Sequence, residues 1–172
     1  MRIMGIDQSL TCTGYSILDV EDGKVELVAF GQIETESDQS LGLRLNVIGN
    51  KIYEVAKEYQ PDAFAREQGI VRHNNVTKKL YRVVGVIDYV LAPFLDGRDI
   101  EEISITGAKK AVTGNGKAEK HEVEKAVINY FQLDEDTFRT PRGRLLDDQV
   151  DAIAMGLAYA ERKGLIKLER EG

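Results

Sequence analysis

Four carboxylates interrupt or end segments that are otherwise apolar. Asp7 and Glu67 each close an apolar run. Asp151 lies inside the apolar stretch 150–155, and Asp148 lies three residues before Asp151. Burying an ionised carboxylate is costly unless a cation or hydrogen bonds compensate for the lost water. If several of these carboxylates converge on one place in the fold, they imply a bound cation.

Length and composition indicate a single enzyme-sized domain. With 172 residues, of which 42% are hydrophobic, residues 1–172 are expected to form one domain with a full core. The only cysteine, Cys12, excludes an intramolecular disulfide and a paired-cysteine zinc site. No segment approaches the roughly 18 apolar residues of a membrane span. We expect a soluble, cytoplasmic protein without a membrane partner.

Charge is distributed unevenly along the chain. The net charge of -6 argues against a nucleic-acid partner, but the acids are concentrated in 19–38, whereas 66–82 holds five basic residues and one acid. Further basic groups at 109–120 and 139–144 flank the candidate carboxylates. Two divalent cations would bring -6 to about -2 (-6 + 4). A polyanionic partner is therefore compatible with this chain, although solvated basic surfaces explain the same clusters equally well.

The order of the expected elements predicts a mixed α/β sheet. An Asp-Gly turn at 21–23 joins two strands of an opening antiparallel meander. Apolar residues then follow a helical spacing from Leu41, with Ser40 as N-cap. The order suits a mixed sheet of about five strands with helices on both faces. The expected strands are 2–7, 14–20, 24–34, 61–67 and 100–106, and the expected helices begin at Leu41 and cover 76–91, 119–131 and 147–162.

Asp148 and Asp151 differ in how strongly the sequence favours a functional role for them. Asp148 and Asp151 are three residues apart, so their side chains share a helix face, with Asp147 as the expected N-cap. Acids in a first turn also suit the helix dipole, which explains Asp148 without any function. Asp151 has almost only apolar neighbours, so a functional role is favoured there. Carboxylates suit Mg²⁺ or Mn²⁺, and two such ions can stabilise an in-line displacement at phosphorus.

A glycine-containing turn at 114–117 does not form a nucleotide-binding loop. The phosphate-loop pattern requires a glycine where Ala111 stands and a serine or threonine where Ala118 stands. The turn nevertheless leads to a helix N-terminus with Lys117 and Lys120 nearby. This arrangement could hold a phosphate of DNA.

Five segments together resemble the RuvC family of Holliday-junction resolvases, in order and spacing, over about 160 residues. The segments are 3–7, 13–17, Glu67-Gln68, 114–120 and 148–152. The resemblance implies an RNase H-like fold, a homodimer, and Mg²⁺-dependent nicking of two opposed strands at a four-way DNA junction. It also implies 5'-phosphate and 3'-hydroxyl products.

The resemblance assigns roles to individual residues by position. It implies that the catalytic and metal-binding acids are Asp7, Glu67, Asp148 and Asp151. The implied cofactor is two Mg²⁺ ions, with Mn²⁺ as a substitute, and the helix 76–91 would contribute to the dimer interface. The resemblance places Lys109 and Lys120 near the cut phosphate. Together with the basic clusters it gives a predicted DNA-binding set of Lys109, Lys117, Lys120, Arg72 and Lys78.

Three features depart from the family pattern. Gln8 and Ser9 follow Asp7 where the family commonly has Pro-Gly, and Ile70 stands where cellular members have an aromatic wedge. The chain is also acidic, whereas cellular members tend to be basic. These departures resemble phage-type RuvC-like nucleases, which extends the possible substrates to other branched DNA.

Two other functions compete with this hypothesis. A noncatalytic RNase H-like nucleic-acid-binding module would be expected to lose at least one of the four acids, and all four are present. A phosphotransferase of the actin and sugar-kinase superfamily shares a Gly-x-Asp segment in its first strand, but it needs two lobes around the nucleotide, and 172 residues supply about one.

Overall fold

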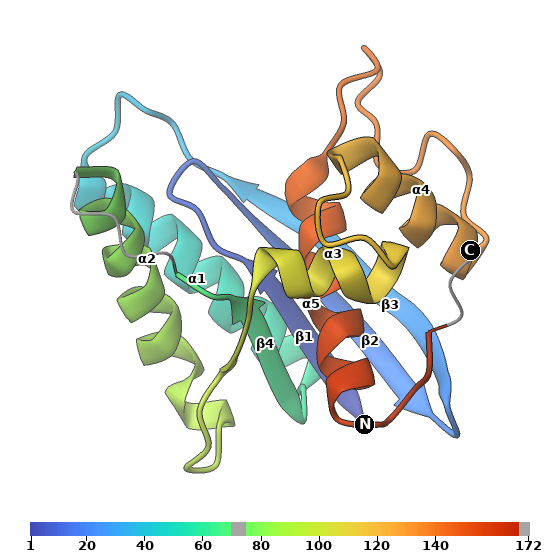
Figure 1. The fold of residues 1–172 in the computed structure, drawn as a ribbon. Helices are drawn as coiled ribbons and strands as arrows, with labels where there is room; N and C mark the ends of the chain where they lie inside the picture. Colours follow the sequence, from blue (N-terminus) through green and yellow to red (C-terminus); the bar gives the residue numbers. More distant parts are fainter. Residues whose placement is uncertain (70–74, 169–172) are drawn as a thin grey trace.

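A five-stranded mixed sheet forms the centre of the protein (Figure 1). The computed structural model describes residues 1–69 and 75–168. The first three strands are antiparallel, and the last two run parallel to the first, so the strand order is β3-β2-β1-β4-β5. The predicted mixed sheet is confirmed. The strands are β1 (Arg2–Asp7), β2 (Cys12–Glu21), β3 (Lys24–Glu34), β4 (Ala63–Glu67) and β5 (Glu101–Ile103).

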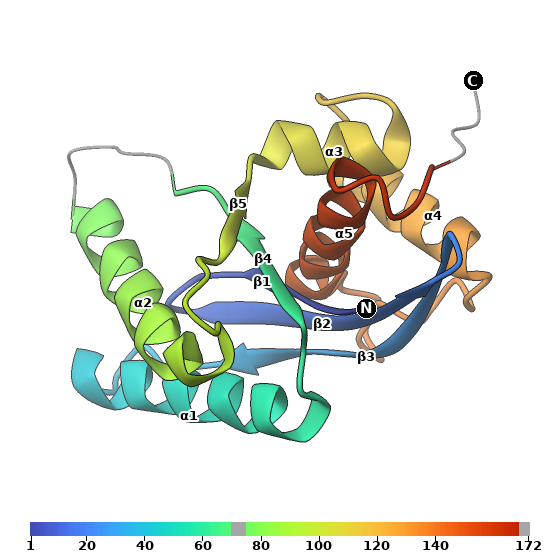
Figure 2. The ribbon, with the colours of Figure 1, turned by 90° about the horizontal axis from the view of Figure 1, so that it is seen from below.

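Helices cover both faces of the sheet, as Figure 2 shows. One face packs against α1 (Leu41–Tyr59) and α2 (Asn75–Leu91), which leads into a short 3-10 helix, η1 (Ala92–Phe94). The opposite face carries α3 (Ile105–Thr113), α4 (Lys120–Phe131) and α5 (Asp147–Arg162). Two apolar cores result, one on each side of the sheet. Within the described ranges, no helix combines the length and hydropathy needed to cross a bilayer.

The alternation of side chains along β1 decides where its terminal acid points. Met4 and Ile6 are fully buried in the core under α1 and α2, whereas Ile3 is buried in the core under α5. Because strand side chains alternate with a period of two, Asp7 lies on the α5 side together with Ile3 and Gly5. The same rule places Glu67 on that side, since Ala63 and Ala65 of β4 belong to the α5 core.

The backbone of α5 lies directly against the sheet. A Cβ atom on Gly5 would stand 2.1 Å from the carbonyl oxygen of Ala152, so only glycine permits this approach. The hydroxyl of Ser16 donates a hydrogen bond of 2.9 Å to the same carbonyl oxygen. This contact fixes α5 over the centre of the sheet.

Most element boundaries agree with the sequence predictions, and the Asp-Gly turn is confirmed. Asp22 (φ 49°) and Gly23 (φ 77°) both adopt the left-handed conformation that such a turn requires. The strand expected over 100–106 is wrong in its second half. β5 ends at Ile103, and the Ser104 hydroxyl then accepts a hydrogen bond from the amide of Gly107, which begins a helix that was not predicted, α3.

Candidate active site

The four predicted carboxylates line one pocket of about 220 Å³. Asp7 ends β1 and Glu67 ends β4, and these strands are parallel neighbours with Ile6 in register with Arg66. The carboxyl ends of both strands therefore meet at the same edge of the sheet. The third and fourth carboxylates come from the first two turns of α5, which crosses that edge.

The side chains of Asp7 and Glu67 lie close enough that each affects the pKa of the other. Burial raises the pKa of Asp7 well above its ordinary value, and the negative charges of Asp151 and Glu67 raise it further. Both carboxyl groups at these strand ends therefore favour the neutral form more than exposed acids do.

Burial also raises the pKa of Asp151, to about 6, while the positive charge of Lys120 acts in the opposite direction. The pKa of Glu67 is raised by burial as well, and its hydrogen bond with Asp7 partly offsets this effect. Three carboxyl groups that resist ionisation in one pocket are a common feature of functional sites. A cation among them would reverse the effect by favouring the charged forms.

Two of the predicted DNA-binding lysines line this pocket. The ammonium of Lys109 donates a hydrogen bond of 2.6 Å to the carbonyl oxygen of Ala118. Lys120 forms an ion pair with Asp147, and both residues line the pocket. The site therefore carries fixed positive charge beside its carboxylates.

The other predicted DNA-binding residues are not brought to the pocket. Lys117, before α4, and Lys78, on α2, are exposed and do not line it. Arg72 lies outside the described residues. Ile70, which stands where cellular family members have an aromatic wedge, also lies outside the described residues.

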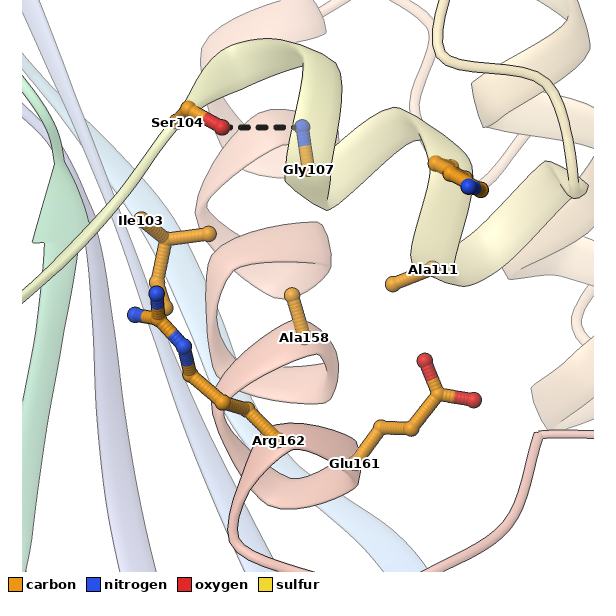
Figure 3. A pocket seen from close by; sticks show the side chains of 8 residues that line it. Ile103, Ser104, Gly107, Ala111, Ala158, Glu161 and Arg162 are labelled. Carbon is orange, nitrogen blue, oxygen red and sulfur yellow. Dashed lines mark hydrogen bonds between the residues drawn. The ribbon is translucent and has the colours of Figure 1, made fainter.

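A second hollow, of about 280 Å³, lies on the other side of α3 and contains none of the four carboxylates (Figure 3). Its walls include Ile103, Ala111 and Ala158, and Arg162 at its rim donates a hydrogen bond of 3.1 Å to a carboxylate oxygen of Glu101. Although this hollow is slightly larger, the acidic pocket has the groups that can carry out chemistry. We therefore assign the candidate active site to the acidic pocket.

Comparison with known proteins identifies the family. Residues 3–159 match the family described as crossover junction endodeoxyribonuclease RuvC. The chain belongs to the RuvC family. A RuvC protein of Methylorubrum extorquens is 31% identical over 99% of this chain and 85% of its own length. A RuvC protein of Synechococcus is 34% identical over 94% of this chain and all of its own length.

Solved structures of RuvC proteins share the fold. Thermus thermophilus RuvC superposes with a TM-score of 0.75 at 25% identity, covering 97% of this chain and 99% of the other. The same protein in complex with a Holliday junction substrate gives a TM-score of 0.76 at 21% identity, with the same coverage. The yeast mitochondrial Holliday junction resolvase gives 0.69 at 12% identity, covering 95% of this chain and 79% of that one. The RNase H-like fold expected from the resemblance is thus confirmed.

Two residues at or beside the pocket of this RuvC-family chain were not predicted as site residues. Asp147 was expected to cap α5, but Leu146 occupies the N-cap position and the side chain of Asp147 binds Lys120 instead. Gln8, which replaces a family proline, is buried, and its amide donates a hydrogen bond of 2.6 Å to the Glu67 carbonyl oxygen. The departure at Gln8 was visible in the sequence, but its contact with β4 was not.

The carboxylates of this RuvC-family site fit a divalent cation by their chemistry. As the side chains stand, no group of three or more His, Cys, Asp or Glu residues within the described ranges is arranged to hold an ion. The pocket nevertheless gathers buried carboxyl groups with raised pKa values, and oxygen ligands of this kind suit a hard cation, which would favour their charged forms. Asp7, Glu67, Asp148 and Asp151 are the residues that could hold it.

Proposed function

We propose that this RuvC-family protein is an endodeoxyribonuclease that cuts four-way DNA junctions, or related branched DNA, at the acidic pocket. The single observation that supports it best is the meeting of four carboxylates and two lysines at one edge of the sheet. Relatives at 31% and 34% identity are named crossover junction endodeoxyribonucleases, and one solved relative holds a Holliday junction substrate.

The proposed cofactor is two Mg²⁺ ions, with Mn²⁺ as a substitute, held by Asp7, Glu67, Asp148 and Asp151. When bound, such ions supply charge stabilisation at the attacked phosphate and a lowered pKa for water. Without a cation, burial raises the pKa of Asp151 to about 6, and a bound cation would favour the charged form in which Asp151 can hold it. Asp7 and Glu67, whose pKa values are raised by burial, would likewise be charged when they hold the ions.

The lysines are proposed to hold the DNA phosphate. The hydrogen bond from Lys109 to the Ala118 carbonyl oxygen and the ion pair of Lys120 with Asp147 orient both ammonium groups at the pocket wall. Their charges offset the negative charge that builds up on a phosphate during displacement, and preorganised charges of this kind need no rearrangement during the reaction.

We further propose that two copies of the chain form a homodimer through α2, so that two sites act on opposed strands. The support is an unusually exposed set of large apolar side chains on the outer helices. Tyr89 on α2 is 82% exposed and Tyr81 is 45% exposed. On the neighbouring helix α1, Leu43, Val47 and Tyr53 are 48%, 37% and 41% exposed. Apolar surface of this kind commonly marks a protein interface.

The experiment that tests the function compares DNA substrates of one sequence. End-labelled four-way junction, Y-fork and linear duplex are incubated with the protein in Mg²⁺, in Mn²⁺ and in EDTA. We expect rapid cutting of the junction with either metal, slow cutting of linear duplex, and none in EDTA. Equal cutting of all three substrates would reject structure-selective cutting, and an inactive protein that still binds junctions would favour a noncatalytic module.

A further inference from the structure

Another cleft, distinct from the hollow beside α3, adjoins the acidic pocket and shares a wall with it. The cleft has a volume of about 230 Å³ and is lined by the start of β2, the end of β3 and the segment 144–148. Asp147 and Asp148 line both the cleft and the acidic pocket. An extended polymer that lies across the acidic pocket would therefore continue into this cleft.

A hairpin formed by residues 139–145 stands beside the cleft. Arg139 and Leu145 form an antiparallel bridge, and the amide of Thr140 donates a hydrogen bond of 2.9 Å to the Arg144 carbonyl oxygen. Gly143 adopts the left-handed conformation that the tight turn requires (φ 78°). In Figure 1 the hairpin is drawn in orange and projects past the N-terminal end of α5.

The base of this hairpin is fixed to the core. The guanidinium of Arg139 donates a hydrogen bond of 2.6 Å to Glu124, whose side chain is only 5% exposed. The amide of Leu146 donates a hydrogen bond of 2.8 Å to the carbonyl oxygen of Phe138, a fully buried residue. A buried acid held by the hairpin makes the position of the hairpin costly to change. The backbone from which Arg144 projects is thus held in place.

Arg144 lines the cleft and is weakly engaged. Its guanidinium lies 3.5 Å from a carboxylate oxygen of Glu34, and the two side chains are 70% and 62% exposed. An exposed contact at this distance contributes little to stability. Glu34 also accepts a hydrogen bond of 2.5 Å from the Gln32 amide, so it keeps a partner if Arg144 moves away. Arg144 can therefore exchange Glu34 for another anion.

We propose that the cleft is a second phosphate-binding subsite, in which Arg144 exchanges Glu34 for a backbone phosphate of the DNA strand being cut. The inference rests on the proposed function, because the shared wall of Asp147 and Asp148 places this phosphate next to the attacked one. A guanidinium suits the role because it binds phosphate oxygens in a bidentate manner. In the absence of DNA, the contact with Glu34 keeps the Arg144 side chain in the cleft.

Binding of a fluorescent four-way junction in EDTA, where no cutting occurs, tests the subsite. Removal of Arg144 (Arg144→Ala) should weaken binding roughly five- to tenfold and lower the slope of log affinity against log salt by about 0.9, as for one lost phosphate contact. Arg144→Lys should retain part of the affinity. Arg98→Ala is the matched control, because Arg98 is exposed in the turn before β5, at the opposite end of that strand from the pocket.

Substitution of Glu34 tests whether this carboxylate competes with DNA for Arg144. If Glu34 competes with DNA for Arg144, Glu34→Gln should tighten junction binding a few-fold, and the gain should shrink in the Arg144→Ala background. Thermal melting of each variant checks that it is folded.

The subsite is rejected if Arg144→Ala matches Arg98→Ala in affinity and in salt dependence while the unaltered protein still cuts junctions, and the proposed function then stands. If the unaltered protein neither binds nor cuts junctions, both proposals are rejected.

Discussion

The Asp148 carbonyl oxygen lies so close to Gly14 that a Cβ atom placed on the glycine would stand 1.9 Å from it. Gly14 is paired across the sheet with Asp7. The contact therefore sets how near the first turn of α5 approaches the end of β1, and with it the spacing of the carboxylates on the two elements.

Replacement of this glycine should damage both stability and activity. In Gly14→Ala the added methyl meets backbone, which cannot move aside like a side chain, and we expect a loss of about 1–3 kcal/mol in the free energy of unfolding. Junction cutting should fall with it, because α5 must shift. Urea denaturation and cutting assays measure the two effects. Gly42→Ala is the control, since its Cβ would meet open space in α1 and it should be neutral or stabilising. A Gly14→Ala protein equal to the unaltered one would show that the contact is unimportant.

Lys120 should matter for cutting and little for folding. Its ion pair with Asp147 is exposed, with side-chain exposures of 64% and 30%, so Lys120→Ala should change the melting temperature only slightly. Cutting should slow roughly ten- to a hundredfold, because a preorganised positive charge is lost from the pocket. Lys125→Ala, an exposed lysine on the same helix, should cut normally. Equal rates for the two variants would exclude a role for Lys120 in the reaction.

Tyr89 should control assembly. Its side chain is 82% exposed on α2, and a charged residue there would oppose burial against a second copy. Tyr89→Glu should sediment as a monomer and produce single rather than paired nicks. Gln132→Glu, an exposed change after α4, should leave assembly unaltered. A dimer that survives Tyr89→Glu would place the interface elsewhere.

The raised carboxyl pKa values predict an unusual pH dependence for the metal-free protein. Asp151 binds its proton more tightly when folded, with a pKa of about 6 against 3.8 as a reference. The stabilising contribution of the proton is therefore complete below about pH 4 and is lost as the pH rises through about 6. In EDTA the free energy of unfolding should fall between about pH 4 and 6 and level off above that range. Asp151→Asn should flatten this decline and raise stability at pH 7 by up to about 3 kcal/mol, and an unchanged profile would contradict the burial of this charge.

Much of the site was predictable from local patterns. Asp7 and Glu67 stand at the ends of apolar strands, and parallel neighbours end at the same edge, so the strand order alone brings them together. Asp151 was the acid least explained by helix stability, and it lies in the pocket with a raised pKa. The close approach of α5 to Gly14 was not predicted.

Other features depend on contacts between segments far apart in the sequence. The strand expected over 100–106 was an error of local interpretation, because its apolar, β-branched residues favour a strand although Ser104 is of a type that commonly caps helices. The pairing of Asp147 with Lys120, of Gln8 with the Glu67 carbonyl, and of Arg139 with Glu124 each joins distant segments. Side-chain pairing of this kind appears only when the chain is folded.

Cutting of an end-labelled four-way junction by Asp151→Asn, at saturating Mg²⁺, tests most directly whether the acidic pocket is the active site. The variant should bind the junction and melt no lower than the unaltered protein in EDTA, but cut it on the order of a hundredfold more slowly or not at all. Full cutting by a folded Asp151→Asn protein would contradict the assignment of the active site to this pocket.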